Sequence, residues 1–146
     1  MIIRKYKSDD FEQLADIYNA SHPDEFYCED GDFSFVPWAD DKYIMSILGD
    51  SDVYVCEGSS ILGFCGYLEN NINWLFVRPE SRGQGVAAKL LEYVLPKLEN
   101  GATLSVWKSN ARAKALYEKF GFLLQKELSV NFQGRNLLVN KMVIGN

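Results

Sequence analysis

The sequence predicts a single α/β domain, with a mixed sheet of six or seven strands and helices on both faces. The 146 residues are 47% hydrophobic and 24% charged, which is typical of one globular domain, here spanning residues 1–146. Runs with strand character and runs of helical periodicity are both spread along the chain. No internal repeat, linker or low-complexity tract divides it.

Seven segments have the apolar and β-branched character of strands and are bounded by turn residues. The predicted strands are residues 2–6, 53–57, 61–68, 72–77, 102–107, 122–130 and 136–144. Asn70-Asn71 and Gln133-Gly134 are tight-turn signals. We therefore expect the strands between residues 53 and 77 to form a meander, and the last two strands to form a hairpin.

Four segments repeat apolar residues at the spacing of a helix. The predicted helices are residues 9–20, 39–48, 84–98 and 110–120. Asp9 is the predicted N-cap of the first helix, with Glu12 as its capping-box partner. Asn110 is predicted to cap the start of the last helix, and Gly121 to end it.

Composition and charge argue against several partners. The formal net charge of −5 disfavours a nucleic-acid surface. No apolar run approaches the ~18 residues that a membrane span needs, and the N-terminus lacks the apolar core of a signal peptide. Three cysteines without a C-x-x-C pair favour buried thiols at Cys56 and Cys65 over a metal site. We therefore expect a cytoplasmic protein with no membrane, nucleic-acid or metal partner.

The segment from Leu75 to Leu91 predicts a binding site for a phosphate group. An apolar strand runs into a short polar turn, and the helix that follows starts at Gly83-Gln84-Gly85, nearly bare of side chains. Such a start leaves several backbone N–H groups unpaired, and the helix dipole adds roughly half a positive charge behind them. A phosphate or pyrophosphate fits there without a lysine.

Two common phosphate sites fit this segment poorly. A P-loop is excluded because the chain contains no Gly-Lys-Ser/Thr. Residues 83–88 match G-x-G-x-x-A, the fingerprint of a dinucleotide fold, but residues 78–82 separate them from the strand. The next strand also ends without an acidic residue that would hold a ribose 2′-hydroxyl.

Two sequence blocks, in order, resemble the GNAT N-acetyltransferase superfamily. Residues 82–87, Arg-Gly-Gln-Gly-Val-Ala, resemble its Gln/Arg-x-x-Gly-x-Gly/Ala signature, and residues 110–122 resemble its Asn-x-x-Ala-x-x-x-Tyr-x-x-x-Gly-Phe block. The order of the predicted elements is also similar. The resemblance implies the acyl-CoA N-acyltransferase (GNAT) fold. It also implies an enzyme that transfers the acetyl group of acetyl-CoA, its co-substrate, to a primary amine of a small molecule or peptide.

The resemblance further implies roles for individual residues. The pyrophosphate of acetyl-CoA would lie on the backbone N–H groups of residues 82–87, here called the glycine turn. The pantetheine arm would pair with the edge of the preceding strand. The cofactor residues would be Leu75, Phe76, Val77, Arg82, Gly83, Gln84, Gly85, Val86, Ala87 and Asn110. The Val77 N–H would be the oxyanion donor, and Tyr117 the general acid that protonates the leaving thiolate. Two plainer interpretations stay open, namely Arg82 as a solvated turn residue and Tyr117 as core packing.

The general base is not assigned by these patterns. Attack on the thioester requires a neutral amine, and about one alkylamine in a thousand is neutral at pH 7. Many family members carry a glutamate on the fourth strand, but Asn73 stands at about that place here, and an amide cannot accept the proton. Glu69, His22, Glu25 and a water chain are the candidates left.

The stretch from Ser21 to Trp38 is the predicted acceptor loop. It holds acidic and aromatic residues interleaved, without a lysine or arginine, and this composition suits a cationic amine. Glu25, Tyr27 and Trp38 are its predicted contacts. The alternative is a solvated acidic loop whose aromatic residues cover the sheet. Polyamine, aminoglycoside, amino-acid and peptide acceptors are all compatible, and so is an acyl group longer than acetyl.

A second function is compatible with the same blocks, namely a non-catalytic module that binds acetyl-CoA as a sensor or partner subunit. The lack of a glutamate on the fourth strand favours the non-catalytic module, whereas Tyr117 and Asn110 favour the enzyme. The apolar last hairpin packs either internally or against another protomer, so a monomer and a homodimer are both expected states.

Overall fold

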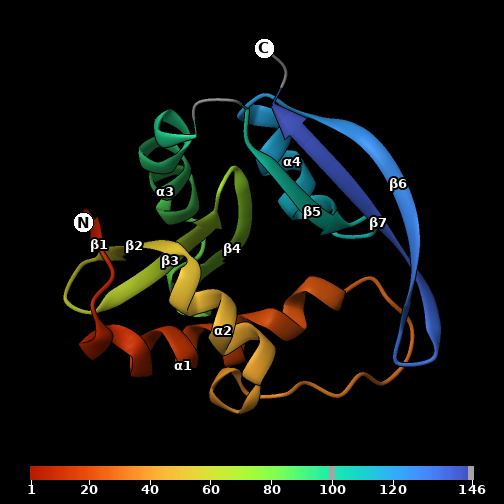
Figure 1. The fold of residues 1–146 in the computed structure, drawn as a ribbon, viewed down its shortest axis with the longest axis horizontal. Coiled ribbons are helices and arrows are strands. Elements are labelled where there is room, and N and C mark those ends of the chain that lie inside the picture. Colours follow the sequence, from red (N-terminus) through yellow and green to blue (C-terminus); the bar gives the residue numbers. More distant parts are fainter. Residues whose placement is uncertain (99–100, 145–146) are drawn as a thin grey trace.

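Seven strands form one mixed sheet in the order β1-β2-β3-β4-β5-β7-β6, in a computed structural model that describes residues 1–98 and 101–144 (Figure 1). The strands are β1 (Ile2–Lys5), β2 (Asp52–Glu57), β3 (Ile61–Leu68), β4 (Asn71–Val77), β5 (Thr103–Trp107), β6 (Phe122–Phe132) and β7 (Arg135–Ile144). Neighbouring strands are antiparallel except β4 and β5, which run parallel. The predicted mixed sheet is therefore confirmed.

Helices cover both faces of this sheet (Figure 1). They are α1 (Phe11–Ser21), α2 (Lys42–Asp50), α3 (Val86–Val94) and α4 (Ala111–Lys119), with 3₁₀ turns η1 (Ser8–Asp10), η2 (His22–Phe26), η3 (Trp38–Asp40), η4 (Pro79–Ser81) and η5 (Leu95–Lys97). Leu14 and Ile17 of α1 pack with Phe64 in one core, while α3 packs with Cys65 and Leu104 in another. Within residues 1–98 and 101–144, no helix is both long and apolar enough to cross a membrane.

A β-bulge in β4 changes which core its side chains enter. Trp74 lies opposite Gly66 and Ile72 lies opposite Tyr67, so Asn73 is the extra residue on the β4 side. Ile72 consequently belongs to the core under α3, whereas Trp74 belongs to the core under α1. The strict alternation of a regular strand would have put both side chains on one face.

β4 and β5 pair for only two residues and then separate. The register joins Asn71 to Thr103 and Ile72 to Leu104, and no other pair joins these two strands in the described residues. One edge of β4 is thus open from residue 73 to residue 77. Because an unpaired edge presents backbone N–H and C=O groups, an extended ligand can pair with this one.

The helix ends differ from the predicted ones by a few residues. Asp9 does not cap α1, because the chain first makes the turn η1, in which the Asp10 carboxylate accepts a hydrogen bond from the Lys7 N–H. The second helix starts at Lys42, where the Asp41 side chain caps it. α3 is shorter than the predicted helix, since the glycine turn precedes it and η5 follows it.

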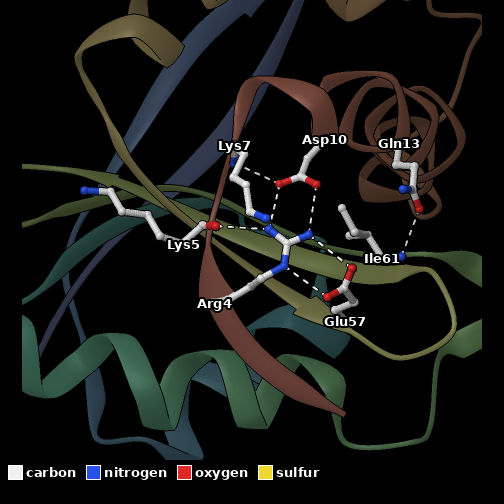
Figure 2. A network of polar contacts seen from close by, with 7 residues as sticks. All are labelled: Arg4, Lys5, Lys7, Asp10, Gln13, Glu57 and Ile61. Atoms are coloured by element: carbon white, nitrogen blue, oxygen red, sulfur yellow. Dashed lines mark hydrogen bonds and ion pairs between the residues drawn. The ribbon is translucent and has the colours of Figure 1, made fainter.

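A part-buried ion-pair network ties β1 to η1 and to β2 (Figure 2). The Arg4 guanidinium donates to both carboxylate oxygens of Asp10, at 2.8 and 2.9 Å, and to both of Glu57, at 3.0 and 3.1 Å. Hydrogen bonding from Arg4 holds the pKa of the Asp10 carboxyl below its usual range. Because the Asp10 side chain is only 9% exposed, solvent screens this pair less than a surface pair.

We expect Arg4→Met to lower the free energy of unfolding by about 2 kcal/mol at pH 7, because it leaves the enclosed Asp10 carboxylate without its partner. Urea denaturation measures the loss. Lys5→Met is the matched control, since Lys5 reaches Asp52 at 3.8 Å on the surface, where a pair contributes at most about 1 kcal/mol.

The pH dependence of this loss has a definite sign. The folded pKa of Asp10 is lowered, so its contribution is present above the unfolded value of about 3.9 and is lost as pH falls through the folded one. The difference in the free energy of unfolding between the wild type and Arg4→Met should therefore disappear at low pH. A difference that persisted through that range would contradict the role of this pair.

Candidate active site

A groove of about 380 Å³ opens where β4 and β5 separate. Residues of both strands line it, together with η2, the glycine turn before α3 and the first part of α4. Of the predicted site residues, those lining the groove are Glu25, Leu75, Phe76, Val77, Arg82, Gly83, Asn110 and Tyr117. Most of the predicted site is thus brought together, although its segments are far apart in the chain.

The open edge of β4 directs the backbone of Val77 into the groove. On the β3 side, the Arg78 N–H donates to the Leu62 C=O at 2.7 Å. Successive residues of a strand direct their polar backbone groups to opposite sides, so those of Val77 face the open edge. There the Val77 C=O accepts a hydrogen bond from the buried Ser21 hydroxyl at 2.9 Å. The Val77 N–H is left as a donor on the groove side.

The glycine turn presents bare backbone N–H groups at the start of α3. Gly83 and Gly85 have φ angles of +78° and +79°, and a Cβ added to either would meet no atom within 4 Å. The Lys89 N–H makes the first helical hydrogen bond, to the Gly85 C=O. In the part of the chain that the structure describes, the N–H groups of residues 83–88 have no partner. The turn therefore has the free donors and the open space that an anion needs.

The side chains of the other predicted pyrophosphate contacts differ in their exposure to solvent. Val86 is buried in the core under α3, so only its backbone is available to a ligand. Gln84 is exposed and Ala87 is half-buried. The Arg82 guanidinium forms an ion pair with Asp24 of η2 at 2.8 Å. Arg82 thus joins the glycine turn to η2 across the groove.

Tyr117 of α4 lines the groove and packs its ring against Phe122. The two ring centroids lie 5.8 Å apart, and Tyr117 is half-buried. Burial, and then the charge of the Glu25 carboxylate, raise the pKa of the Tyr117 hydroxyl. The hydroxyl therefore stays protonated at neutral pH, as a general acid must.

Asn110 caps α4 as predicted. Its Oδ1 accepts a hydrogen bond from the Ala113 N–H at 3.3 Å. At the other end, Gly121 follows the helix with a φ of +95°, the left-handed conformation that ends many helices. These two ends set where α4 starts and stops, and so where Tyr117 lies along the groove.

The candidates for the general base occupy different places. Glu69 lies in the exposed turn between β3 and β4, outside the groove lining. Asn73 lines the groove at the bulge, but its Oδ1 accepts a hydrogen bond from the Asn71 amide at 2.7 Å. Glu25 lines the groove, and its Oε1 lies 2.7 Å from His22 Nδ1.

The sequence matches a known family. Residues 49–123, about half of the chain, match the sequence model of the family described as an acetyltransferase (GNAT) domain. YafP of Escherichia coli strain K12, an uncharacterized N-acetyltransferase, is 30% identical over 135 residues, which cover 90% of this chain and 87% of that protein. The chain belongs to the GNAT acetyltransferase family.

Two further proteins are similar to this acetyltransferase. YjaB of Salmonella typhimurium, a peptidyl-lysine N-acetyltransferase, is 31% identical over 83 residues, 57% of each chain. The structure of yncA from Salmonella typhimurium, solved with acetyl-CoA, has a TM-score of 0.74 at 18% identity and covers 99% of this chain and 92% of that chain. The protein is an acetyl-CoA-dependent acyltransferase with the GNAT fold, and a domain spanning all of residues 1–146 stays a prediction.

The predicted acceptor contacts of the acetyltransferase fall outside the groove lining, apart from Glu25. Trp38 is fully buried against Phe64 and Trp74. Because a side chain without exposed surface cannot touch a ligand, we leave Trp38 out of the acceptor site. Tyr27 is 43% exposed, and the Arg112 guanidinium carbon lies 4.0 Å from its ring centroid.

The rest of the acceptor loop is tied to the β6–β7 hairpin, which it meets in Figure 1. The Gln133 side chain exchanges two hydrogen bonds with the Ser34 backbone, at 2.6 and 2.9 Å. The ring of Phe26 in η2 stacks on Phe132 with centroids 5.1 Å apart. These contacts anchor the chain on both sides of residue 30 and so hold η2 over the groove.

Two residues of the groove have no signal in the sequence. Ser21 supports the Val77 carbonyl, and Arg112 stacks on Tyr27. Ser21 ends a helix and Arg112 stands at a variable position of the second family block. Their roles depend on partners far along the chain, and no local pattern shows such partners.

Proposed function

We propose that this enzyme transfers the acetyl group of acetyl-CoA to a primary amine by direct attack within a ternary complex. One observation carries the proposal: a single groove is lined by the open edge of β4, by Gly83 at the start of the glycine turn and by Tyr117. A thioester laid along this edge would have a phosphate site at one end and an acid at the other.

The residues present fit the donor substrate. The N–H groups of residues 83–88 would bind the pyrophosphate, because the space beside Gly83 and Gly85 is open. The edge of β4 from Leu75 to Val77 would pair with the pantetheine amides through Leu75, whose backbone groups face the open edge, whereas those of Phe76 face β3. The Val77 N–H would donate to the thioester oxygen as negative charge develops on it.

Tyr117 is the proposed general acid. A bound alkylammonium, whose ordinary pKa is about 10.4, must first become neutral. Its nitrogen then attacks the acetyl carbonyl carbon, and the C–S bond breaks as the tetrahedral intermediate collapses. The Tyr117 hydroxyl protonates the departing sulphur, which requires the protonated form that burial preserves.

The proposed acceptor is a cationic amine, either a small molecule or part of a peptide. Glu25 gives the η2 side of the groove a carboxylate, whereas the charge of Asp24 is met by Arg82. The part-exposed ring of Tyr27 is an outer contact. The name of YjaB, a peptidyl-lysine N-acetyltransferase, supports an acceptor of this class. The cytoplasmic location and the monomeric or homodimeric state stay predictions.

Release of free thiol from acetyl-CoA tests the proposal. The protein is mixed with acetyl-CoA and, in parallel, with spermidine, kanamycin, lysine and a lysine-containing peptide, and mass spectrometry identifies the acetylated amine. We expect thiol release that depends on at least one amine and requires both substrates bound together. Binding of acetyl-CoA without release across the panel would instead favour the non-catalytic module. Ping-pong kinetics would contradict direct attack.

A further inference from the structure

We infer that the Glu25 carboxylate is the general base that deprotonates the amine, and that His22 holds this carboxylate in place. The inference rests on the proposed acetyl transfer and supplies its proton acceptor. Its basis is the contact of Glu25 with the His22 imidazole and the groove that Glu25 shares with Tyr117.

Glu25 is the carboxylate in the groove that is best able to accept a proton. Among the described residues that line the groove, the acidic side chains are Asp24 and Glu25. The Arg82 guanidinium holds Asp24 at 2.8 Å, so protonation of Asp24 would break an ion pair. Asn73 offers an amide whose oxygen is already bonded, and Glu69 lies outside the lining.

His22 orients the Glu25 carboxylate through a hydrogen bond. The two atoms, His22 Nδ1 and Glu25 Oε1, are 2.7 Å apart, and Nδ1 is the donor because an ionised carboxylate only accepts. The imidazole is itself held by rings: it stacks on Tyr18 at 4.8 Å and meets Phe35 and Phe76 at 5.4 and 6.3 Å. An imidazole packed in this way fixes one carboxylate oxygen and leaves the other for the amine.

Glu25 and Tyr117 line the same groove, so both side chains can reach substrates bound in it. Burial and then the Glu25 charge raise the pKa of Tyr117 and also that of Tyr18, the latter to about 12. The ionisable groups around Glu25 are His22, which contacts it, Tyr18 of α1, whose pKa the Glu25 charge raises, and the groove-lining residues Asp24, Arg82, Arg112 and Tyr117.

The proposed step balances in protons. Glu25 takes one proton from the bound ammonium, and the neutral nitrogen attacks the acetyl carbon. As the C–S bond breaks, Tyr117 gives its proton to the sulphur and recovers one from the newly acetylated nitrogen. One proton leaves per turnover, from Glu25 to solvent, and the products are the amide and the free thiol of coenzyme A.

The pH dependence of Glu25→Gln tests the base assignment. With the best acceptor of the amine panel, kcat/KM should fall by about 100- to 1,000-fold at pH 7, because only the neutral fraction of the amine can then react. The deficit should shrink by about tenfold per pH unit, as that fraction rises, and disappear at about pH 9 to 10. Glu69→Gln is the matched control: it removes the same charge outside the groove and should keep the wild-type profile.

Two substitutions test the positioning role of His22. His22→Asn keeps an N–H donor near the place of Nδ1 and should retain most of the activity. His22→Phe keeps a ring but loses the donor, and should lower kcat by about tenfold with little change in KM for acetyl-CoA. Because His22 is the single histidine, its imidazole ¹⁵N signals need no assignment. The free protein should show a protonated Nδ1, and Glu25→Ala should lose that signature.

Different outcomes identify which proposal fails. Wild-type protein without any amine-dependent thiol release overturns the proposed function, and the base assignment with it. Amine-dependent release that survives Glu25→Gln at pH 7 overturns the base assignment alone. The positioning role of His22 is overturned if His22→Asn and His22→Phe lose kcat equally, or if Glu25→Ala leaves the Nδ1 signal unchanged.

Discussion

Gly85→Glu should lower the affinity for acetyl-CoA by at least about 100-fold. The substitution places a carboxylate over the N–H groups proposed to hold the pyrophosphate, in space that is open in this structure. Two like charges 4 Å apart repel by about 4 kcal/mol near a protein surface, which corresponds to roughly a thousandfold in affinity. Isothermal titration calorimetry with acetyl-CoA measures the loss.

Gly134→Glu is the control for backbone strain. Gly134 lies at the tip of the β6–β7 hairpin with a φ of +82°, close to the +79° of Gly85, and a Cβ there also meets no atom within 4 Å. A non-glycine residue in this conformation costs about 1 kcal/mol. Both variants should therefore lose similar stability, while only Gly85→Glu loses acetyl-CoA. If Gly85→Glu bound acetyl-CoA with wild-type affinity, the assignment of the pyrophosphate site to the glycine turn would be wrong.

Tyr117→Phe should lower kcat by about 100-fold and leave the Kd for acetyl-CoA unchanged. The phenyl ring preserves the packing against Phe122, so the substitution removes only the hydroxyl that is proposed to protonate the sulphur. Steady-state thiol release and calorimetry separate the two effects. Tyr93→Phe, which removes a hydroxyl from an exposed position on α3, is the control. If Tyr117→Phe turned over at the wild-type rate, Tyr117 would have no part in the chemistry.

The raised pKa of Tyr117 also determines how the wild-type rate should respond to alkali. A general acid works while it is protonated, and burial keeps this hydroxyl protonated beyond its ordinary pKa of about 10. Wild-type kcat should therefore not fall between neutral pH and that value through loss of the Tyr117 proton. An earlier fall that Tyr117→Phe abolished would show that burial does not protect the hydroxyl.

Elements with strong local signals were predictable from the sequence. The glycine turn lies between β4 and α3 as expected, because Gly83 and Gly85 adopt the positive φ that few other residues tolerate. Asn110 caps α4 as expected, because its side chain acts on a backbone group three residues away. The family resemblance was confirmed for a similar reason, since each of its two blocks is a contiguous segment.

The surroundings of side chains were harder to predict than the elements. Trp38 ends an acidic and aromatic stretch that suited an acceptor site, yet the rings of Tyr18 and Phe64 enclose it in the core. Ile72 and Trp74 share a period that would place them on one face, but the bulge at Asn73 sends them into different cores. No pattern within a few residues signals either outcome.

Local patterns in the sequence were enough to predict the α/β class, the bare start of α3, the cap of α4 and membership of an acetyltransferase family. Which carboxylates reach the groove depends on how the chain packs in three dimensions. Glu25 and Tyr117 stand on segments far apart in the chain. Both line one groove because η2 follows α1 on one face of the sheet and α4 packs on the other, where the sheet opens between β4 and β5. Turns and caps arise from interactions within a few residues, whereas the side chains that line a groove together depend on long-range packing that one sequence does not display.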